Sequence, residues 1–190
     1  MKLTETHIID KDNKLWNACD NVCFLSKNLY NYANYIIRQE FIQTSKDKEN
    51  NLRTNANWIH YNELDKLLRS TSQYDYKLLP NNTSQQILMV LDRNWKSFFQ
   101  SIKDWKKNPS KYNGRPCLPK YKDKIKGRNL VVFTTSQVKV KDGIIKFPKL
   151  SSIGSIKTKI KPNQLKQVRI VPCIGCYKIE VVYEKEIQKT

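Results

Sequence analysis

Apolar residues near the start of this chain alternate as in a β-strand, and those that follow recur every three or four residues as in α-helices. Later in the chain the pattern is that of β-strands only. Residues 2–9 can form a short strand, and apolar side chains then recur at steps of mostly three or four from Trp16 to Phe41, as on one face of a helix. The stretch Thr44–Asn57 is rich in Lys, Asn, Asp and Ser and lacks this period, so it predicts a loop. A short helix is predicted over Ile59–Arg69.

The clearest helical pattern begins after Pro80. Asn82 or Thr83 can cap this helix, and Thr83 with Gln86 has the spacing of a capping box. The apolar positions alternate three and four apart and are Leu88, Leu91, Trp95, Phe98, Ile102 and Trp105. This stripe predicts the core of a helix bundle, so we expect most of its rings to be buried rather than free to stack on bases.

Proline and glycine residues between positions 109 and 119 end the helical pattern, and alternating β-branched residues follow. Asp142-Gly143 has the composition of a tight hairpin turn. The predicted later strands are Leu130–Thr135, Gln137–Val140, Ile144–Phe147, Gln164–Val171 and Tyr177–Glu184. Since the first strand can pair with these, the sequence predicts an α+β fold in which residues 1–14 and 115–190 form a small β-barrel and residues 15–114 form a helical insertion.

Positive charge is concentrated in the second half of the chain. The sequence has 35 Lys and Arg against 17 Asp and Glu, a formal net charge of +18. Residues 101–190 hold 22 of the basic and 6 of the acidic residues, and residues 103–128 alone hold ten basic and two acidic ones. Such charge repels itself unless a polyanion neutralises it, and the interleaved rings can stack on bases. The pattern favours a nucleic-acid partner.

Other features bear on compartment and class. The 39% hydrophobic content is too high for a disordered basic tail. No apolar run approaches the roughly 20 residues that span a bilayer, and the first residues lack the apolar middle of a signal peptide. The cysteines, which favour reduced thiols over a disulfide framework, are Cys19, Cys23, Cys117, Cys173 and Cys176. We therefore expect a cytoplasmic protein without a membrane partner.

The sequence contains no recognisable set of catalytic or metal-binding residues. Two-metal nuclease chemistry needs several carboxylates that converge on one phosphate, whereas Asp92 and Asp104 are predicted on the polar side of the long helix. Cys173-Ile-Gly-Cys176 has CxxC spacing, which indicates a hairpin turn or, as the alternative, a metal site shared with Cys19 and Cys23. We favour the turn and expect no catalytic residue, metal or cofactor.

Several short motifs occur in an order that resembles a known family. They are Leu79-Pro80, Gln85-Gln86, Leu91-Asp92-Arg93, Phe98-Phe99, Gly114-Arg115-Pro116, Pro119-Lys120-Tyr121-Lys122, Phe133-Thr134-Thr135, Pro148-Lys149-Leu150 and Val168-Arg169-Ile170. Each motif is weak by itself. Their order and spacing over essentially the whole chain resemble the amino-terminal half of TnpB, the transposon-encoded RNA-guided DNA nuclease family related to type V CRISPR effectors.

The resemblance implies an oligonucleotide-binding-like barrel, the wedge domain, with an inserted helical recognition domain. In the family these domains hold guide RNA and the guide–target heteroduplex and read a short motif in the double-stranded target DNA, while base pairing reads the sequence. The RuvC nuclease domain of the family, with its carboxylate ligands, has no counterpart before Thr190. The expectation is therefore a binding half that does not cut by itself.

The resemblance also implies which groups read the adjacent DNA motif. They fall at Tyr61 on the short helix, at Asn81, Asn82 and Gln85 where the long helix begins, and at Thr134 and Thr135 after the first barrel strand. Amide side chains at the amino end of a helix suit base edges and phosphates. The alternatives are a helix cap for Asn81 and a solvated surface position for Gln85.

Charge indicates a second set of binding residues, for RNA. Tyr112 and Tyr121 are the candidates for stacking on bases. The candidates for phosphate contacts are Lys106, Lys107, Lys111, Arg115, Lys120, Lys122, Lys124 and Arg128, followed by Lys157, Lys159, Lys161 and Arg169.

Two other functions stay open at this point. One is a DNA-binding accessory protein or repressor that acts without RNA. The other is one subunit of a split nuclease, whose partner is a separate RuvC chain. Selection of one duplex sequence by RNA-free protein would favour the first, and a neighbouring reading frame that encodes a RuvC domain would favour the second.

Overall fold

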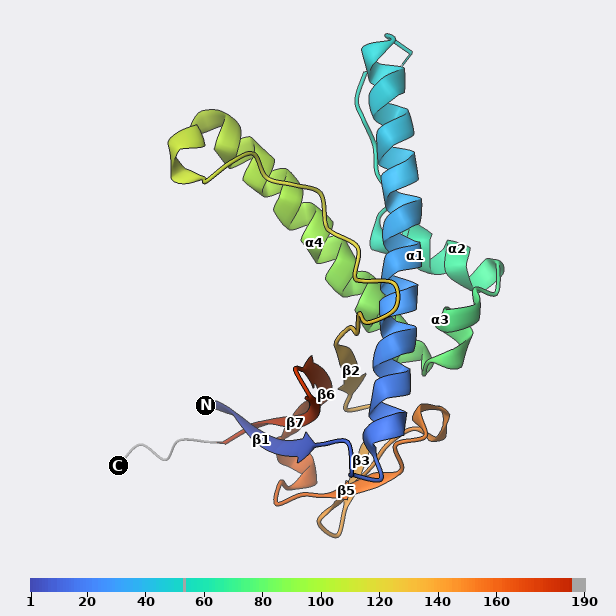
Figure 1. Ribbon diagram of the computed structural model, residues 1–190, viewed down its shortest axis with the longest axis vertical. Helices are drawn as coiled ribbons and strands as arrows, with labels where there is room; N and C mark the ends of the chain where they lie inside the picture. The colour runs from blue at the N-terminus through green and yellow to red at the C-terminus, as the bar shows by residue number, and fades with distance from the viewer. Residues whose placement is uncertain (53, 186–190) are drawn as a thin grey trace.

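The structure, a computed structural model, describes residues 1–52 and 54–185 and shows a mixed α+β chain (Figure 1). Helices lie between the first strand and the later strands, as expected. In chain order the elements are β1 (Lys2–Ile9), α1 (Trp16–Glu49), α2 (Tyr61–Ser70), α3 (Tyr74–Leu78), α4 (Asn81–Lys107), β2 (Val131–Thr134), β3 (Lys139–Lys141), β4 (Ile144–Lys146), β5 (Ser155–Lys157), β6 (Leu165–Cys173) and β7 (Cys176–Glu184). Short 3-10 turns occupy Pro109–Lys111, Lys149–Ser151 and Pro162–Gln164.

The first strand joins the last ones in space. β1, β7, β6 and β2 form one antiparallel sheet in that order, with Lys2 opposite Glu184 and Ile9 opposite Tyr177. The predicted pairing of the first strand with the later sheet is confirmed. The predicted turn at Asp142-Gly143 is also confirmed, because both residues have the positive φ values, 51° and 71°, that a tight hairpin turn requires.

The expected closed barrel is not formed. Among the described residues, β3, β4 and β5 make a separate three-stranded sheet, and neither sheet closes on itself. Where β1 approaches the segment after β5, a side chain replaces the backbone ladder: the backbone N–H of Lys159 donates to the Glu5 carboxylate over 3.1 Å. The sheets instead meet through side chains, with the rings of Phe133 and Phe147 5.3 Å apart.

The two long helices, α1 and α4, lie beside the four-stranded sheet (Figure 1). α1 and α4 pack together near the sheet and diverge toward their far ends (Figure 1). The apolar stripe of α4 is accordingly buried at Leu91 and Trp95, and only partly buried at Phe98 and Trp105. The indole N–H of Trp95 donates to the Asn34 side chain on α1 over 3.0 Å. The predicted helix core is thus confirmed for the inner half of the stripe.

The predicted loop at 44–57 is wrong in its first part, because α1 continues to Glu49. The buried Thr44 hydroxyl explains this continuation: it accepts a hydrogen bond from the Asn57 backbone N–H (2.9 Å) and lies 2.8 Å from the Asn57 carbonyl. The segment around Asn57, which lies beyond the end of α1, therefore stabilises the last turns of this helix. Lys, Glu and Gln are also good helix formers without any apolar period.

The predicted capping box is wrong as well. α4 begins at Asn81 with Pro80 at the cap position and without a side-chain cap. The Thr83 hydroxyl, which the capping box needs, lies 3.2 Å from the Val132 carbonyl and donates to it. The Thr83 hydroxyl, which the local sequence predicts at the helix cap, is instead bound to the backbone of β2.

Candidate nucleic-acid interface

A strap of irregular backbone, residues 115–130, returns from the outer end of α4 along α1 (Figure 1). Asparagine side chains on α1 hold its backbone. The Asn34 amide donates to the Pro119 carbonyl (2.9 Å), and Asn31 both donates to the Lys122 carbonyl (2.9 Å) and accepts from the Lys122 N–H (2.8 Å). These contacts satisfy backbone groups that no strand pairs with.

Nearer the sheets, the strap is held by a buried lysine. Lys27 is 2% exposed and donates from Nζ to the Lys124 carbonyl over 2.6 Å, while the same ammonium lies 3.9 Å from the Phe24 ring centroid. Burial lowers the pKa of Lys27. The Ser26 hydroxyl donates to the Leu130 carbonyl over 2.9 Å, which leads the strap into β2. The Lys27 ammonium therefore stabilises the fold and is not available to a ligand.

One carboxylate joins the strap, α1 and the sheet. Asp20 accepts two hydrogen bonds from the Arg128 guanidinium, at 2.7 and 3.0 Å, and one from the Tyr177 hydroxyl at 2.5 Å. Hydrogen bonding to Arg128 lowers the pKa of Asp20, whereas burial and the bond to Asp20 raise the pKa of Tyr177. Arg128, a candidate for phosphate binding, is placed in this structural cluster.

The strap leaves its other cations exposed. Lys120, Lys122 and Lys124 alternate with non-basic residues and are all exposed. The ring of Tyr121 is covered on one side by the Arg38 guanidinium, 4.5 Å from its centroid, and the residue as a whole remains 44% exposed. The strap thus presents several exposed ammonium groups beside an accessible ring, and that of Lys122 lies 5.5 Å from the Tyr30 ring centroid.

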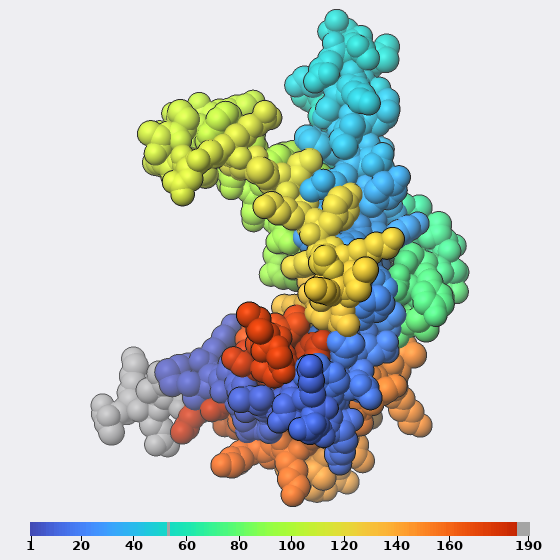
Figure 2. Space-filling model, in the orientation of Figure 1, coloured from blue at the N-terminus to red at the C-terminus, as the bar shows by residue number. Residues whose placement is uncertain are grey.

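A groove of about 440 Å³ separates this part of the strap from α4. Its walls combine rings, small polar groups and cations, and they include Tyr30, Asn94, Ser97, Phe98, Ser101, Lys120, Tyr121 and Lys122. Figure 2 shows the same face of the molecule hollowed between the outer end of α4 and the sheets, with the yellow strap along its inner side. Rings for stacking and cations for phosphates therefore face one concave surface.

The amino end of α4 gathers several predicted DNA-reading groups. The Asn82 amide donates to the Ser136 hydroxyl over 2.9 Å, and that hydroxyl lies 2.8 Å from the Thr134 hydroxyl. Thr135 is exposed next to them. Asn81 does not cap the helix; its side-chain oxygen accepts from the Tyr76 hydroxyl over 3.1 Å. The structure thus joins Asn82 to Thr134 through a serine that sequence reasoning missed.

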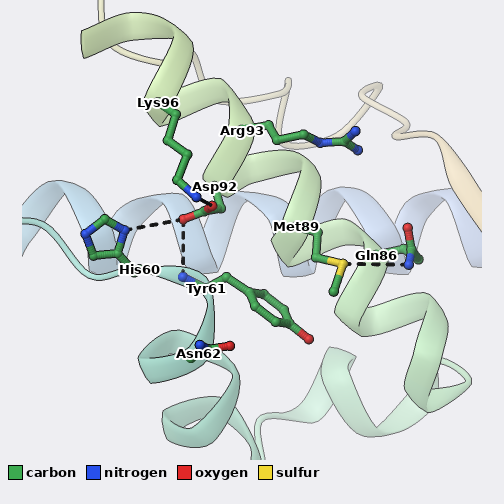
Figure 3. Close-up of a pocket in the computed structure, with 8 residues that line it drawn as sticks. All are labelled: His60, Tyr61, Asn62, Gln86, Met89, Asp92, Arg93 and Lys96. Carbon is green, nitrogen blue, oxygen red and sulfur yellow. Dashed lines mark hydrogen bonds and ion pairs between the residues drawn. The ribbon is translucent and has the colours of Figure 1, made fainter. Parts of the chain in front are cut away.

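Tyr61 lies in a different hollow, between α2 and α4 (Figure 3). This pocket has a volume of about 590 Å³ and includes Gln86 and Met89, whereas Gln85 is half-buried outside its lining. Figure 3 shows the Tyr61 ring beside Met89, with Arg93 projecting from the next turn of α4. The pocket therefore offers a flat ring, an amide and a guanidinium to one ligand.

Asp92 anchors the wall of this pocket and corrects the expectation that it lies on the solvated side of the helix. It is 6% exposed. Its carboxylate accepts from the Tyr61 backbone N–H (3.2 Å) and pairs with Lys96 (2.6 Å), and His60 Nδ1 lies 3.8 Å away (Figure 3). Asp92 thus fixes the start of α2 against α4.

The remaining basic candidates are spread over other surfaces. Arg169 is paired with Glu180 over 2.6 Å, across neighbouring strands. Tyr112 donates its hydroxyl to Asp104 over 2.9 Å, which ties the turn after α4 back to that helix. The exposed basic residues that make no such contact with the described residues include Lys106, Lys107, Lys111 and Arg115 near the outer end of α4 and Lys157, Lys159 and Lys161 around β5.

The two cysteine pairs do not form a shared metal site. Cys19 and Cys23 are buried in α1, whereas Cys173 is exposed at the tip of the β6–β7 hairpin. Within residues 1–52 and 54–185, no three His, Cys, Asp or Glu side chains are grouped so as to hold a metal ion. Gly175 has a φ of 76°, as the second central position of a type II turn requires, so the predicted hairpin turn is confirmed.

The groups that hold the strap were missed by sequence reasoning. Asn31 and Asn34 lie three residues apart in α1, and this was the available signal, since helical residues three apart share a face. Asp20 and Lys27 gave no such signal, because neither belongs to a repeat of like side chains along the helix.

No protein-family model matches the chain, and no curated protein matches it. Among the described residues, no helix combines the length and apolar character needed to cross a bilayer.

Proposed function

We propose that the protein binds RNA and DNA as the wedge and recognition portion of a TnpB-like RNA-guided nuclease and does not cut by itself. The observation that carries the proposal is the strap, whose backbone is held by α1 while Lys120, Lys122 and Lys124 stay exposed. A fixed backbone lowers the entropy cost of placing cations along a polyanion. The family assignment itself rests on the order of the sequence motifs.

In this proposal the concave face between α4 and the strap receives RNA. Its contacts are phosphates on the strap lysines and bases on Tyr121, a combination that binds without reading sequence. Such a surface suits a protein whose specificity comes from base pairing between guide and target.

The amino end of α4 and the Tyr61 pocket would then serve the DNA duplex. Asn82 and Thr134 present amide and hydroxyl groups, which donate to and accept from base edges in a groove. Tyr61 on α2 and Gln86 on α4 line a separate hollow between these two helices. The proposal therefore assigns RNA and DNA to different sides of α4.

The test is to purify the full chain from cells, sequence the RNA that copurifies, and then remove that RNA with nuclease and high salt. Fluorescence anisotropy next measures binding of the recovered RNA, a random single-stranded RNA and duplex DNA over a range of salt. We expect enrichment of one RNA and affinity that falls steeply with salt. Failure to bind any RNA at low salt would end the proposal.

Two further outcomes separate the alternatives. RNA-free protein that selects one duplex sequence with nanomolar affinity would identify an RNA-independent DNA-binding protein instead. Target cleavage that appears only when a separate RuvC chain is added to the protein and RNA would identify a subunit of a split nuclease.

A further inference from the structure

The tip of the β6–β7 hairpin carries two accessible thiols. Cys173 is exposed and Cys176 is partly exposed, and only Ile174 and Gly175 lie between them in the turn. Ile174 is fully exposed, so nothing in the described part of the chain covers the tip. Reagents in solution can therefore reach this pair.

The strand register places the two thiols opposite each other. Cys173 and Cys176 are direct partners in the antiparallel ladder, so their side chains leave the same face of the hairpin. Partners of this kind have Cα atoms about 4.5–5.5 Å apart, within the range of about 4.4–6.8 Å that disulfides span. A bond between them needs no rearrangement of the strands.

The other two neighbouring cysteines, Cys19 and Cys23 on α1, differ from the hairpin pair in exposure. Cys19 and Cys23 are 0% exposed, and burial raises the pKa of Cys19 to about 12 and also raises the pKa of Cys23. Because the thiolate is the form that attacks a disulfide, these two thiols are protected from exchange. Any exchange is therefore directed to the hairpin and to the exposed Cys117.

We propose that Cys173 and Cys176 form a reversible dithiol–disulfide switch that exchanges with small disulfides such as oxidised glutathione. The Cys173 thiolate attacks one sulfur of oxidised glutathione and releases one glutathione thiolate. Cys176, as the thiolate, then attacks the mixed disulfide and releases the second. The protein thiols are oxidised to one disulfide, oxidised glutathione is reduced to two thiols, and the two thiol protons end on the released glutathione molecules.

The position of the switch gives it a route to the rest of the fold. Tyr177 follows Cys176 directly, donates its hydroxyl to Asp20, and makes an edge contact with Trp16 at 4.9 Å between ring centroids. Asp20 in turn holds Arg128 of the strap. A change in the hairpin tip therefore reaches the cluster that fastens the strap and the Trp16 ring beside it.

The experiment uses the full chain with Cys117→Ser, which removes the other exposed thiol. This protein is equilibrated with reduced and oxidised glutathione at several ratios. Remaining thiols are alkylated and intact mass is measured. We expect a monomer that is two hydrogens lighter, with two thiols lost together and two, Cys19 and Cys23, alkylated only after denaturation. Further substitution of Cys173→Ser or Cys176→Ser should abolish this species and leave one glutathione adduct.

Three results would overturn the proposal. The first is a pair that stays fully reduced at ratios that glutathionylate the single-cysteine variants. The second is a product with two glutathione adducts or a disulfide-linked dimer in place of the internal bond. The third is protection of both thiols by added zinc with formation of a dimer, which would make the hairpin half of a shared four-thiolate metal site.

Discussion

The strap and the four-stranded sheet both carry basic residues, but the surroundings of these residues differ. In the strap, α1 side chains hold the backbone and Lys120 and Lys122 stay exposed. In the sheet, strand pairing holds the backbone, and Arg169 faces Glu180 across the ladder at 2.6 Å. The difference shows that the positive charge available to a ligand depends on which basic side chains are engaged in ion pairs, and the net charge of +18 does not reveal this.

The largest expected effect tests the strap side of this comparison. Replacing Lys120, Lys122 and Lys124 together by Gln should weaken binding of single-stranded RNA roughly a hundredfold at about 0.1 M salt, because each lost phosphate contact lowers the salt slope by about 0.7. Fluorescence anisotropy over a salt series measures both quantities, with an expected loss of about 2 in slope.

A matched triple variant controls for charge alone. Lys11, Lys48 and Lys66 are also exposed but lie on the loop before α1, near the end of α1 and on α2. Their replacement by Gln should change the slope little. Equal losses in the two triple variants would show that the strap has no special role and that binding follows total charge.

Asp20→Ala should destabilise the fold by about 1–2 kcal/mol, since three hydrogen bonds are lost at a partly exposed site. Chemical denaturation measures this. Glu184→Ala, which removes an exposed ion pair with Lys166 in the sheet, is the control and should leave stability unchanged within error. If both variants behave alike, Asp20 does not fasten the strap.

The Asp20 contribution should depend on pH in one direction. Arg128 lowers the pKa of Asp20 below the unfolded value of about 3.9, so the ionised carboxylate stabilises the fold above that value. The contribution is lost as pH falls through the lower pKa of the folded state. The difference in Tm between wild type and Asp20→Ala should therefore shrink from about pH 5 to about pH 3, and a constant difference would exclude this electrostatic origin.

The smallest expected effect comes from the sheet. Glu180→Gln removes the partner of Arg169 and frees one guanidinium, so RNA affinity should rise about fivefold at about 0.1 M salt if charge is the limiting quantity. Arg169→Gln in the same background should remove the gain. Unchanged affinity in Glu180→Gln would mean that this face of the sheet lies outside the interface.

The fold was predictable where a periodic pattern coincided with a local signal. The strands at 2–9 and 177–184 and the turn at Asp142-Gly143 are all present as expected. Predictions failed where a distant partner decided the outcome. Thr83 gives its hydroxyl to β2 instead of capping α4, and Thr44 extends α1 by pairing with Asn57.

The candidate site follows the same division. Sequence alone determined that the second half of the chain is basic and that Lys120, Tyr121 and Lys122 adjoin one another, because composition and order are local properties. Only the tertiary structure decided that Arg128 is held by Asp20, whereas Lys120, Lys122 and Lys124 make no ion pair within the part of the chain that the structure describes. The reason is that a cation becomes structural or available through groups that meet it in space, and such groups here lie about a hundred residues away.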